Sequence, residues 1–288
     1  MISIYSIKVR LPIFSTRYIE AAEVFTSSLL PSPRTCLSII ARGLCEFNGM
    51  SSEEVINGLR VGDIASWAVE LSSYAFVRPH DPLCKSSHIW RVIMLEAMWK
   101  NRVASLKDAV ECEYITTGEL AIYYVINFKE LNKYVKDNLN SSIKVNDEDI
   151  IKFLSIIQRL GGTEFFSSIR ENPRKQLIIE RLGNNGSINV YIPLNWVKNF
   201  EKGIIESMHV NLLLLEDNKM HNIKNFKSSR EEYRRFLLPL QRLERFGSKS
   251  LTHTWYEPVA VNVRLKDGYV FVKIEDGTAI PIQIGWLS

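Results

Sequence analysis

Cysteine is scarce in this chain of 288 residues, and its four copies, at positions 36, 45, 84 and 112, form no CxxC pair. That spacing favours reduced thiols over a disulfide framework or a zinc ribbon. No apolar run approaches the length that a bilayer requires, so no membrane partner is expected. Residues 1–11 alternate between apolar and polar types, which is not the pattern of a signal peptide. The sequence therefore predicts a cytoplasmic protein.

The fingerprints of several enzyme classes are also missing. The chain has no GxxxxGK[ST] phosphate loop, no GxGxxG dinucleotide motif and no GxSxG nucleophile elbow. We therefore expect no catalytic site of its own and no cofactor. The formal net charge of +4 permits a nucleic-acid partner without arguing for one. With 46% hydrophobic and 24% charged residues, the composition is that of an ordinary globular protein.

The N-terminal part predicts a strand and then a helix. Apolar and polar residues alternate over Tyr5–Leu11, which gives one face that packs and one wet, basic face that includes Arg10. A serine–proline pair at positions 32 and 33 predicts a helix start, and Gly49 a stop. Arg34 and Arg42 share the polar side of this helix with the residue at position 38, at four-residue spacing.

Further elements follow from local signals. Ser51 and Glu54 predict the capping box of a second helix. Residues 78–117 form an irregular insertion that we expect to be helical over 88–106. Strands are predicted over 111–117 and 119–126. Asn146 predicts a helix cap, and Gly161-Gly162 the end of that helix. A hairpin is expected over 176–194, and three strands, over 258–265, 269–275 and 278–286, end the chain.

Two sets of residues could carry chemistry, and each has a simpler alternative. His80, Asp81, Cys84 and His88 could ligate a metal, but a proline at position 82 breaks the helical spacing and no second cluster completes four ligands. A surface loop is the favoured interpretation, with no metal site. A hydroxyl, an ammonium and an imidazole could cleave RNA by acid–base chemistry, from Tyr74, Lys85 and His88. Nothing in the spacing brings these three together.

Basic residues mixed with aromatic ones point to single-stranded RNA. Guanidinium groups neutralise phosphates, and exposed rings stack on unpaired bases. The mixture comprises Arg10, Arg17, Arg34 and Arg42 in the N-terminal elements and Arg78, Trp90, Arg91, Trp99, Lys100 and Arg102 in the insertion. The alternative is that the charges lie on solvated faces and that the tryptophans belong to the core.

Two motifs resemble a known family. Phe14-Ser15-Thr16-Arg17, followed by Leu30-Pro31-Ser32-Pro33-Arg34-Thr35-Cys36-Leu37, resembles the N-terminal signature of the Cas-five family of CRISPR-associated RAMP proteins. Leu160-Gly161-Gly162-Thr163-Glu164 resembles the family's "leucine-glycine-x-x-glutamate" element. The order of parts is similar along nearly the whole chain, closest to the archaeal type I-A branch. The chain departs from the signature at Ser32, Arg34 and Ser38.

The resemblance implies a fold. It is α+β, with a ferredoxin-like (RRM-like) RAMP core over 1–175, a thumb inserted at about 78–118 and a β-rich C-terminal region over 176–288.

The resemblance also implies a role. Members of the family sit at one end of the Cascade surveillance complex, hold the 5′ handle of the CRISPR RNA (crRNA) and lie beside the backbone subunit of the seventh Cas family. The expected partners are thus crRNA and other Cascade subunits, in antiviral defence. The predicted RNA-binding residues are Arg10, Arg17, Arg34, Thr35, Arg42, Arg78, Lys100, Arg102, Gly161 and Gly162. They are expected to form one continuous cradle.

Two alternatives stay open. The same fold could form a metal-independent endoribonuclease that processes precursor crRNA with Tyr74, Lys85 and His88, as the type I-C branch does. The chain could instead be a RAMP subunit of a type III effector complex.

Overall fold

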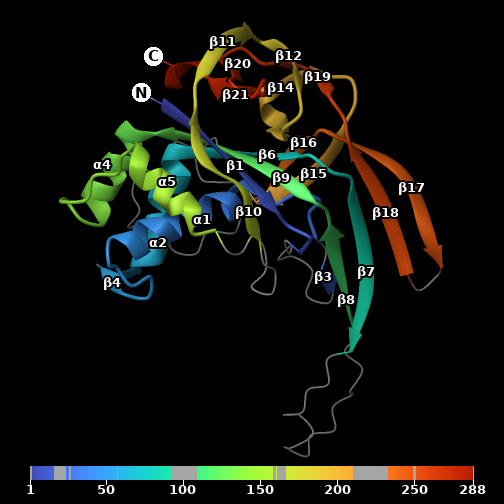
Figure 1. Cartoon of the computed structure of the whole chain (residues 1–288), viewed down its shortest axis with the longest axis horizontal. Coiled ribbons are helices and arrows are strands. Elements are labelled where there is room, and N and C mark those ends of the chain that lie inside the picture. Colours follow the sequence, from blue (N-terminus) through green and yellow to red (C-terminus); the bar gives the residue numbers. More distant parts are fainter. Residues whose placement is uncertain are drawn as a thin grey trace, which may run out of the picture.

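The computed structural model describes residues 2–15, 24–25, 27–56, 58–91, 109–157, 160, 167–209, 233–248 and 251–287. The fold is mixed α/β with mostly antiparallel sheets (Figure 1). None of the helices in these ranges combines the length and the apolar composition that crossing a membrane would require.

A four-stranded sheet forms the centre of the N-terminal half. Its strands are β1 (Ile2–Arg10), β6 (Ser73–Pro79), β9 (Glu119–Asn127) and β10 (Ser168–Gln176). They lie in the order β10-β1-β9-β6, and each neighbouring pair is antiparallel. The predicted strand at the N-terminus and the one over 119–126 are thereby confirmed.

Helices cover one face of this sheet (Figure 1). They are α1 (Pro33–Phe47), α2 (Val61–Ser72), α4 (Phe128–Asn138) and α5 (Asp147–Ser155). Tyr5 and Tyr124 are paired across β1 and β9, so both point to this face. The Tyr124 hydroxyl donates to the carbonyl of Cys36 in α1 at 3.3 Å, and the Tyr5 hydroxyl donates to Asp147 at the start of α5. These bonds fix which face the helices occupy.

The C-terminal half packs against the opposite face. The ring of Tyr74 on β6 lies 5.0 Å from that of Trp196 and 4.5 Å from that of Trp286, centroid to centroid. The Tyr123 hydroxyl on β9 donates to Asp276 at 2.6 Å. Aromatic packing and a partly buried hydrogen bond thus join the two halves of the chain into one core.

Three small antiparallel sheets make up the C-terminal half. One has the order β11-β20-β21, from β11 (Ile178–Gly183), β20 (Tyr269–Ile274) and β21 (Ala279–Gln283). The second has the order β12-β19-β14, from β12 (Asn185–Ile188), β19 (Val261–Leu265) and β14 (Val197–Phe200). The third has the order β13-β16-β15, from β13 (Ile192–Pro193), β16 (Tyr233–Leu238) and β15 (Ile204–His209). Short 3-10 helices lie at Leu194–Trp196 and Ile284–Trp286.

A larger sheet joins the predicted insertion to the C-terminal half. Its order is β17-β18-β7-β8-β2, from β17 (Leu240–Ser248), β18 (Leu251–Pro258), β7 (Leu83–Arg91), β8 (Ala109–Thr116) and β2 (Ile13–Phe14). The two-residue β3 (Val24–Phe25) pairs with β8 in parallel. The long strands β7 and β8 extend away from the helices (Figure 1). The strand predicted over 111–117 is confirmed as β8.

The helix expected over 88–106 is wrong at its start, because β7 continues to Arg91 in pairing with β8. Residues 92–108, including Trp99, lie outside the described residues. Pairing with β8 outweighs the local helical spacing of this segment.

The start of α1 was predicted correctly. The Ser32 hydroxyl accepts from the Thr35 backbone N–H at 3.2 Å, and proline occupies the first turn. The helix ends at Phe47, and Gly49 follows with a φ of 65°, a conformation that favours glycine. Both ends therefore follow from the local sequence.

The start predicted for the second helix was wrong. Residues 51–54 form a turn, and β4 (Val55–Ile56) pairs with β5 (Leu59–Arg60) before α2 begins at Val61. The first amides of α2 donate to backbone carbonyls of this loop: Val61 to Glu54 at 2.8 Å and Gly62 to Ser52 at 3.0 Å. Carbonyl oxygens thus replace the predicted side-chain cap.

The prediction for the helix that begins after Asn146 was right in part. Asn146 caps α5 in a reciprocal capping box, as expected, but the helix ends at Ser155. Apolar residues continue beyond that point because Ile157 and Leu160 are buried in the core, although neither is helical.

The hairpin predicted over 176–194 was wrong, since β11 pairs with β20 and β12 with β19. The three C-terminal strands are present, although β19 and β20 belong to different sheets.

Candidate nucleic-acid interface

Arg34 forms an ion pair with another residue of the chain. Its Nε lies 3.1 Å from Oε1 of Glu70 in α2, a residue with an exposed fraction of only 2%. A buried carboxylate requires a positive partner, so this guanidinium contributes to the stability of the fold. Thr35, the next residue, donates its backbone N–H to Ser32 and places its hydroxyl oxygen 2.9 Å from the Ser32 hydroxyl oxygen.

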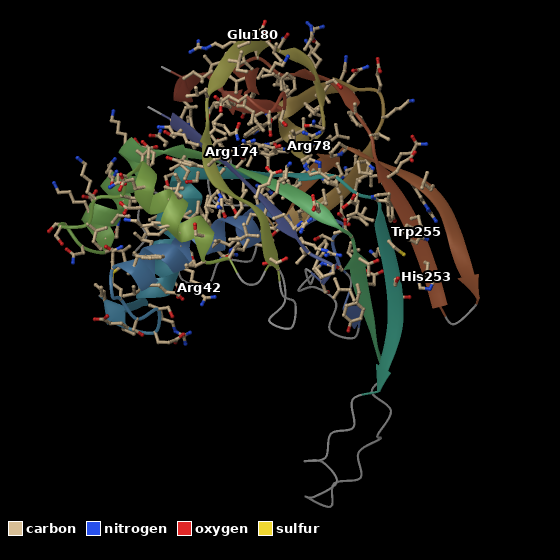
Figure 2. All side chains as sticks on the ribbon, viewed as in Figure 1. Arg42, Arg78, Arg174, Glu180, His253 and Trp255 are labelled. Atoms are coloured by element: carbon tan, nitrogen blue, oxygen red, sulfur yellow. The ribbon has the colours of Figure 1, made fainter. Side chains whose placement is uncertain are left out.

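Arg42 lies further along α1 on the exposed side. Its Nε is 2.6 Å from Oε1 of Glu46, one helical turn away. Both side chains are about half exposed, so this pair contributes little to stability and can be exchanged for another anion. Arg42 is therefore accessible to a ligand on the helix side of the sheet (Figure 2).

Arg10 and Arg78 point to the other face of the sheet. Arg78 pairs with Ala121 on β9, which pairs with Lys8 on β1, so Arg78, Lys8 and Arg10 share the face away from the helices. Arg10 is exposed, whereas Arg78 is half-buried and donates to the Thr278 hydroxyl at 3.1 Å.

The ten predicted residues thus do not form one continuous cradle among the described residues. Arg34, Thr35 and Arg42 lie on the helix side, and Arg10 and Arg78 lie on the opposite face of the sheet. The remaining five, Arg17, Lys100, Arg102, Gly161 and Gly162, lie outside the described residues. The sheet separates the two groups because strand alternation sends Arg10 away from the face that carries α1.

The structure adds residues that the sequence analysis did not select. Strand β10 lies beside β1, and its Arg174 is paired with Ser6 on the face away from the helices. Arg170, also on β10, places its Nε 2.8 Å from Oε1 of Glu119 on β9. We call Lys8, Arg10, Arg78, Arg170 and Arg174 the basic stripe; it crosses the sheet from β10 to β6, and Arg78 and Arg174 are labelled in Figure 2.

Carboxylates neutralise part of the basic stripe. Lys8 Nζ lies 2.5 Å from Oε1 of Glu171, and Arg170 is paired with Glu119. Within the described ranges, the exposed Arg10 and Arg174 form no ion pair. These two guanidinium groups are the stripe's accessible positive charges.

His80 lies at the β6 end of the stripe. Burial, and then the charges of Arg78 and Lys8, lower the pKa of its imidazole, while Glu119 and Asp81 act in the opposite direction. Its Nε2 is buried and has no hydrogen-bond partner among the described residues. The ring is therefore neutral at neutral pH. A negative ligand placed beside Arg78 and Lys8 would favour its protonation.

The metal site that we considered is not assembled in the described part of the chain, where no group of three potential ligands is close enough to hold an ion. Asp81 instead accepts the backbone N–H of Glu119 at 2.6 Å. Cys84 is buried in β7, and the side chain of His88 lies outside the described ones. The loop interpretation holds only for residues 80–82, because Cys84 and His88 belong to strand β7 (Leu83–Arg91), which pairs with β8.

The residues considered for RNA cleavage are also separated. Tyr74 is 4% exposed and packs among tryptophan rings, and its burial raises the pKa of the phenol far above the ordinary value. Lys85 belongs to another sheet, where its Nζ lies 2.8 Å from Glu113 and donates to the carbonyl of Ser27 at 3.1 Å. A phenol in this position cannot reach a ribose hydroxyl.

Fold and site together define a mixed α/β protein that carries a basic stripe on the sheet face away from its helices. No known family model and no curated protein sequence matches the chain. A crystal structure of a CRISPR protein from Archaeoglobus fulgidus is similar over 98% of this chain and 99% of its own, with 12% identity and a TM-score of 0.49. A CRISPR RNA-guided surveillance complex is similar over 97% and 91%, with 8% identity and a TM-score of 0.31. Both likenesses are distant, so function has to be argued from the residues of this chain.

Proposed function

We propose that the chain is a non-catalytic RNA-binding subunit of a type I-A CRISPR Cascade complex and that it holds the 5′ handle of crRNA in antiviral defence. The basic stripe carries the proposal, because two accessible guanidinium groups flank partly neutralised cations on one sheet face. Such a face can bind several consecutive phosphates of one strand. The motifs at positions 14–17, 30–37 and 160–164, which resemble those of the Cas-five family, are the reason for proposing this particular subunit of the complex.

The connectivity of the core supports the same proposal. With α2, β7, β8 and α4 left aside, the elements β1, α1, β6, β9, α5 and β10 follow a βαββαβ path, and this path with the spatial order β10-β1-β9-β6 supports the proposal of a ferredoxin-like core. RNA-binding domains of this kind use the sheet face that their helices leave uncovered. The basic stripe lies on that face. The C-terminal half covers the part that carries Tyr74 and Tyr123, whereas Arg10 and Arg174 stay exposed.

An exposed apolar edge supports membership of an assembly. Leu177, just before β11, and Ile179, its second residue, are each 62% exposed, and all six residues of β11 are exposed. Within the described residues β11 pairs with β20 alone and forms the edge of its sheet. An apolar edge strand of this kind is characteristic of a surface that another protein subunit covers.

Reconstitution with crRNA and the backbone subunit tests the proposal. The chain should join the complex and protect the 5′ handle from nuclease. The double variant Arg10→Ala with Arg174→Ala should reduce that protection, and Lys129→Ala with Lys133→Ala, which removes two exposed lysines of α4, is the matched control. A complex that forms without the chain, or an unprotected handle, would refute the proposal.

The endoribonuclease alternative has a separate test. Precursor crRNA incubated with the chain and a chelator should stay intact, because Tyr74 is enclosed by Trp196 and Trp286. Cleavage that Tyr74→Phe abolishes would reverse this conclusion. Copurification with a type III large subunit in place of the Cascade backbone would instead support the type III alternative.

A further inference from the structure

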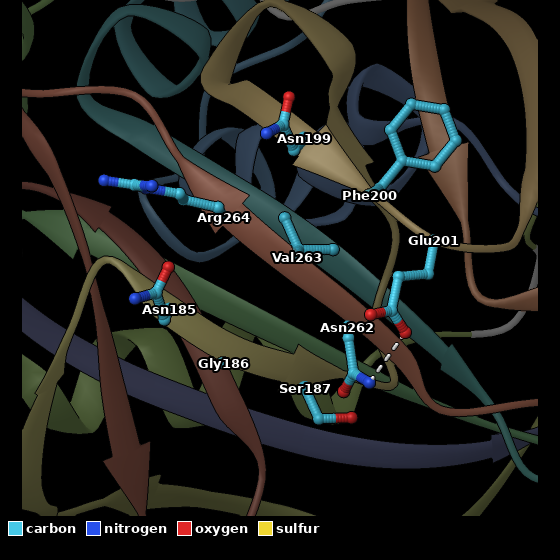
Figure 3. A pocket seen from close by; sticks show the side chains of 9 residues that line it. All are labelled: Asn185, Gly186, Ser187, Asn199, Phe200, Glu201, Asn262, Val263 and Arg264. Carbon is cyan, nitrogen blue, oxygen red and sulfur yellow. Dashed lines mark hydrogen bonds between the residues drawn. The ribbon is translucent and has the colours of Figure 1, made fainter.

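A pocket of about 690 Å³ opens on the sheet β12-β19-β14 (Figure 3). Its polar and its apolar residues do not converge on one space. Arg264 and Asn262 of β19 point to one face of the sheet, and Val263, which lies between them, points to the other. These residues therefore do not assemble a ligand site. The larger sheet β17-β18-β7-β8-β2 offers a better-defined surface.

One face of this larger sheet carries two rows of directly paired residues. The first row crosses four strands, from β18 through β7 and β8 to β2: Trp255, Cys84, Thr116 and Ile13. The second row lies two residues along the strands β18, β7 and β8: His253, Ser86 and Tyr114. Paired residues, and residues two apart in one strand, point the same way, so all seven share one face. We call it the Trp255 face; Trp255 and His253 are labelled in Figure 2.

The Trp255 face is the side of its sheet that faces solvent. On the opposite side, Leu83, Ile115 and Phe14 are fully buried in the core. On the Trp255 face, by contrast, Trp255 is 41% exposed and Ile13 is 43% exposed. These two apolar residues end the first row and lie three strand spacings, or about 14 Å, apart. A folded chain on its own thus leaves a large ring and an aliphatic side chain in contact with water.

The hydroxyl groups of the Trp255 face already have hydrogen-bond partners. The Ser86 hydroxyl oxygen lies 2.8 Å from Nδ1 of His253, which ties the imidazole to the middle strand. The Thr116 hydroxyl donates to the carbonyl of Cys84 at 3.4 Å. A molecule that covers this face therefore leaves neither hydroxyl without a partner, and the cost of removing them from water is small.

The chemistry of the Trp255 face favours a protein as its partner. None of its seven residues is a lysine, arginine, aspartate or glutamate. The cation of β7, Lys85, lies on the opposite side of the sheet, where it forms an ion pair with Glu113. A ribonucleotide backbone requires cations, which the basic stripe supplies and this face does not. Aromatic residues without neighbouring charges are typical of the centre of a protein–protein interface.

The size of the Trp255 face indicates which kind of protein covers it. Two rows of three to four residues occupy on the order of 200 Å² at the spacings of a sheet. A specific interface buries about 800 Å² on each partner. Two copies of this chain that met only at the Trp255 face would therefore dissociate. The face fits a neighbour that other contacts in an assembly also hold in place.

We propose that the Trp255 face docks the protein subunit that lies beside this chain in the assembly, which is the backbone subunit of the proposed complex. Trp255 is the residue whose removal should matter most, because a large exposed ring loses the most contact area when it is truncated. The inference rests on the proposed function for the identity of the docked subunit. The position of the face rests on strand pairing and exposure alone.

Reconstitution with crRNA and the backbone subunit tests the inference. Trp255→Ala should weaken incorporation of the chain at least about tenfold, the loss expected for a central interface tryptophan. Thr116→Lys places an ammonium group in the same row and should have a similar effect. The matched control Phe200→Ala removes an exposed ring from a different sheet and should leave incorporation unchanged. Circular dichroism of each variant confirms that it is folded.

Footprinting of the wild-type chain provides a test that requires no substitution. Hydroxyl radicals should modify Trp255 less in the complex than in the free chain. Equal modification in the two states, or incorporation of Trp255→Ala at the wild-type level, would overturn the inference. A wild-type chain that does not join the complex would refute the proposed function itself and, with it, the identity of the docked subunit.

Two measurements on the isolated chain separate the other possible occupants. Fluorescence anisotropy should give the same RNA affinity for Trp255→Ala as for the wild type, and a loss would assign the face to RNA. Sedimentation velocity should show a monomer. A dimer that Trp255→Ala dissociates would assign the face to a second copy of the chain. Either result would overturn the inference.

Discussion

Arg34 and Glu70 form an ion pair in which the two partners differ in exposure: the side chain of Arg34 is 39% exposed and that of Glu70 only 3%. The pair joins α1 to α2. Arginine in an RNA-binding motif would ordinarily be tested by charge removal, but here that change also leaves a buried carboxylate without this partner.

Arg34→Met should therefore reduce the free energy of unfolding by about 2 kcal/mol, less than for a fully buried pair because Arg34 is partly exposed. Arg42→Met should cost at most about 0.5 kcal/mol, since its partner Glu46 is exposed on the same helix. Urea unfolding measures both values. Equal losses for the two variants would show that the Arg34–Glu70 pair has no structural role.

The stability difference decides how RNA binding by α1 is tested. Arg42 can be changed alone without damage to the fold, whereas Arg34 requires the compensated double variant Arg34→Met with Glu70→Leu, which removes both charges together. A loss of RNA binding in Arg34→Met that the double variant restores reflects the fold. A loss that persists reflects a direct contact.

The basic stripe gives the second prediction. Arg10→Ala with Arg174→Ala should weaken RNA binding and reduce the slope of log affinity against log salt by about 1.4, because each phosphate contact on a single strand contributes about 0.7. Fluorescence anisotropy at several salt concentrations measures the slope. Lys129→Ala with Lys133→Ala should keep the wild-type slope, since these lysines lie on α4, among the helices. A parallel loss in both double variants would contradict the placement of the RNA.

Local structure was predictable where the signal and its partner lie close in the sequence. The Ser32 hydroxyl caps α1 three residues away, and Asn146 and Asp149 complete their capping box within one turn. The pairing of β12 with β19 was not predictable, because it joins Ser187 to Asn262 across most of the C-terminal half. The alternation of apolar and polar residues within a strand does not identify the strand that pairs with it.

The candidate site was likewise predictable only where it depends on residues close together in the sequence. Alternation in the first strand correctly gave an accessible Arg10, but Ser6 on the same face is buried and accepts a hydrogen bond from Gln176, so the predicted wet face is confined to the end of the strand that carries Lys8 and Arg10. Arg170 and Arg174 join that face only because β10 pairs with β1, and Arg34 forms an ion pair within the fold because Glu70 lies next to it on α2. In both cases a residue distant in the sequence determines what the arginine does.

The third prediction concerns the bond between the two halves of the chain. Burial raises the pKa of the Asp276 carboxyl, but the hydrogen bonds from Tyr123 and Thr278 outweigh burial and hold the pKa below its usual range. A lowered carboxyl pKa contributes stability that is present above the unfolded value of about 4 and is lost as the pH falls through the folded value.

Asp276→Asn should therefore cost about 1–2 kcal/mol at pH 7, the usual range for hydrogen bonds to a charged group. The difference from the wild type should shrink as the pH falls below about 4, where the wild-type carboxyl also becomes neutral. Urea unfolding between pH 7 and pH 3 measures it. A difference that stays constant over this range would mean that the carboxylate charge is not what stabilises the contact.

The last prediction uses His80, whose pKa is lowered chiefly by burial and then by Arg78 and Lys8. In the unfolded chain the imidazole takes up a proton near pH 6.5, whereas in the fold it does so only at lower pH. Between these values the unfolded state binds more protons, so the free energy of unfolding falls as the pH is lowered through 6.5. His80→Gln should reduce that fall between pH 7.5 and pH 5.5.

RNA on the basic stripe should reverse this behaviour. Phosphates beside Arg78 and Lys8 would neutralise the charges that oppose protonation, so binding would raise the pKa of His80 and take up a proton. RNA affinity should then increase as the pH falls from 7.5 to 6, and His80→Gln should remove that increase while affinity at pH 7.5 stays the same. Anisotropy titrations at the two pH values measure the effect. An increase that persists in His80→Gln would assign the proton to another group and would place the RNA away from the β6 end of the stripe.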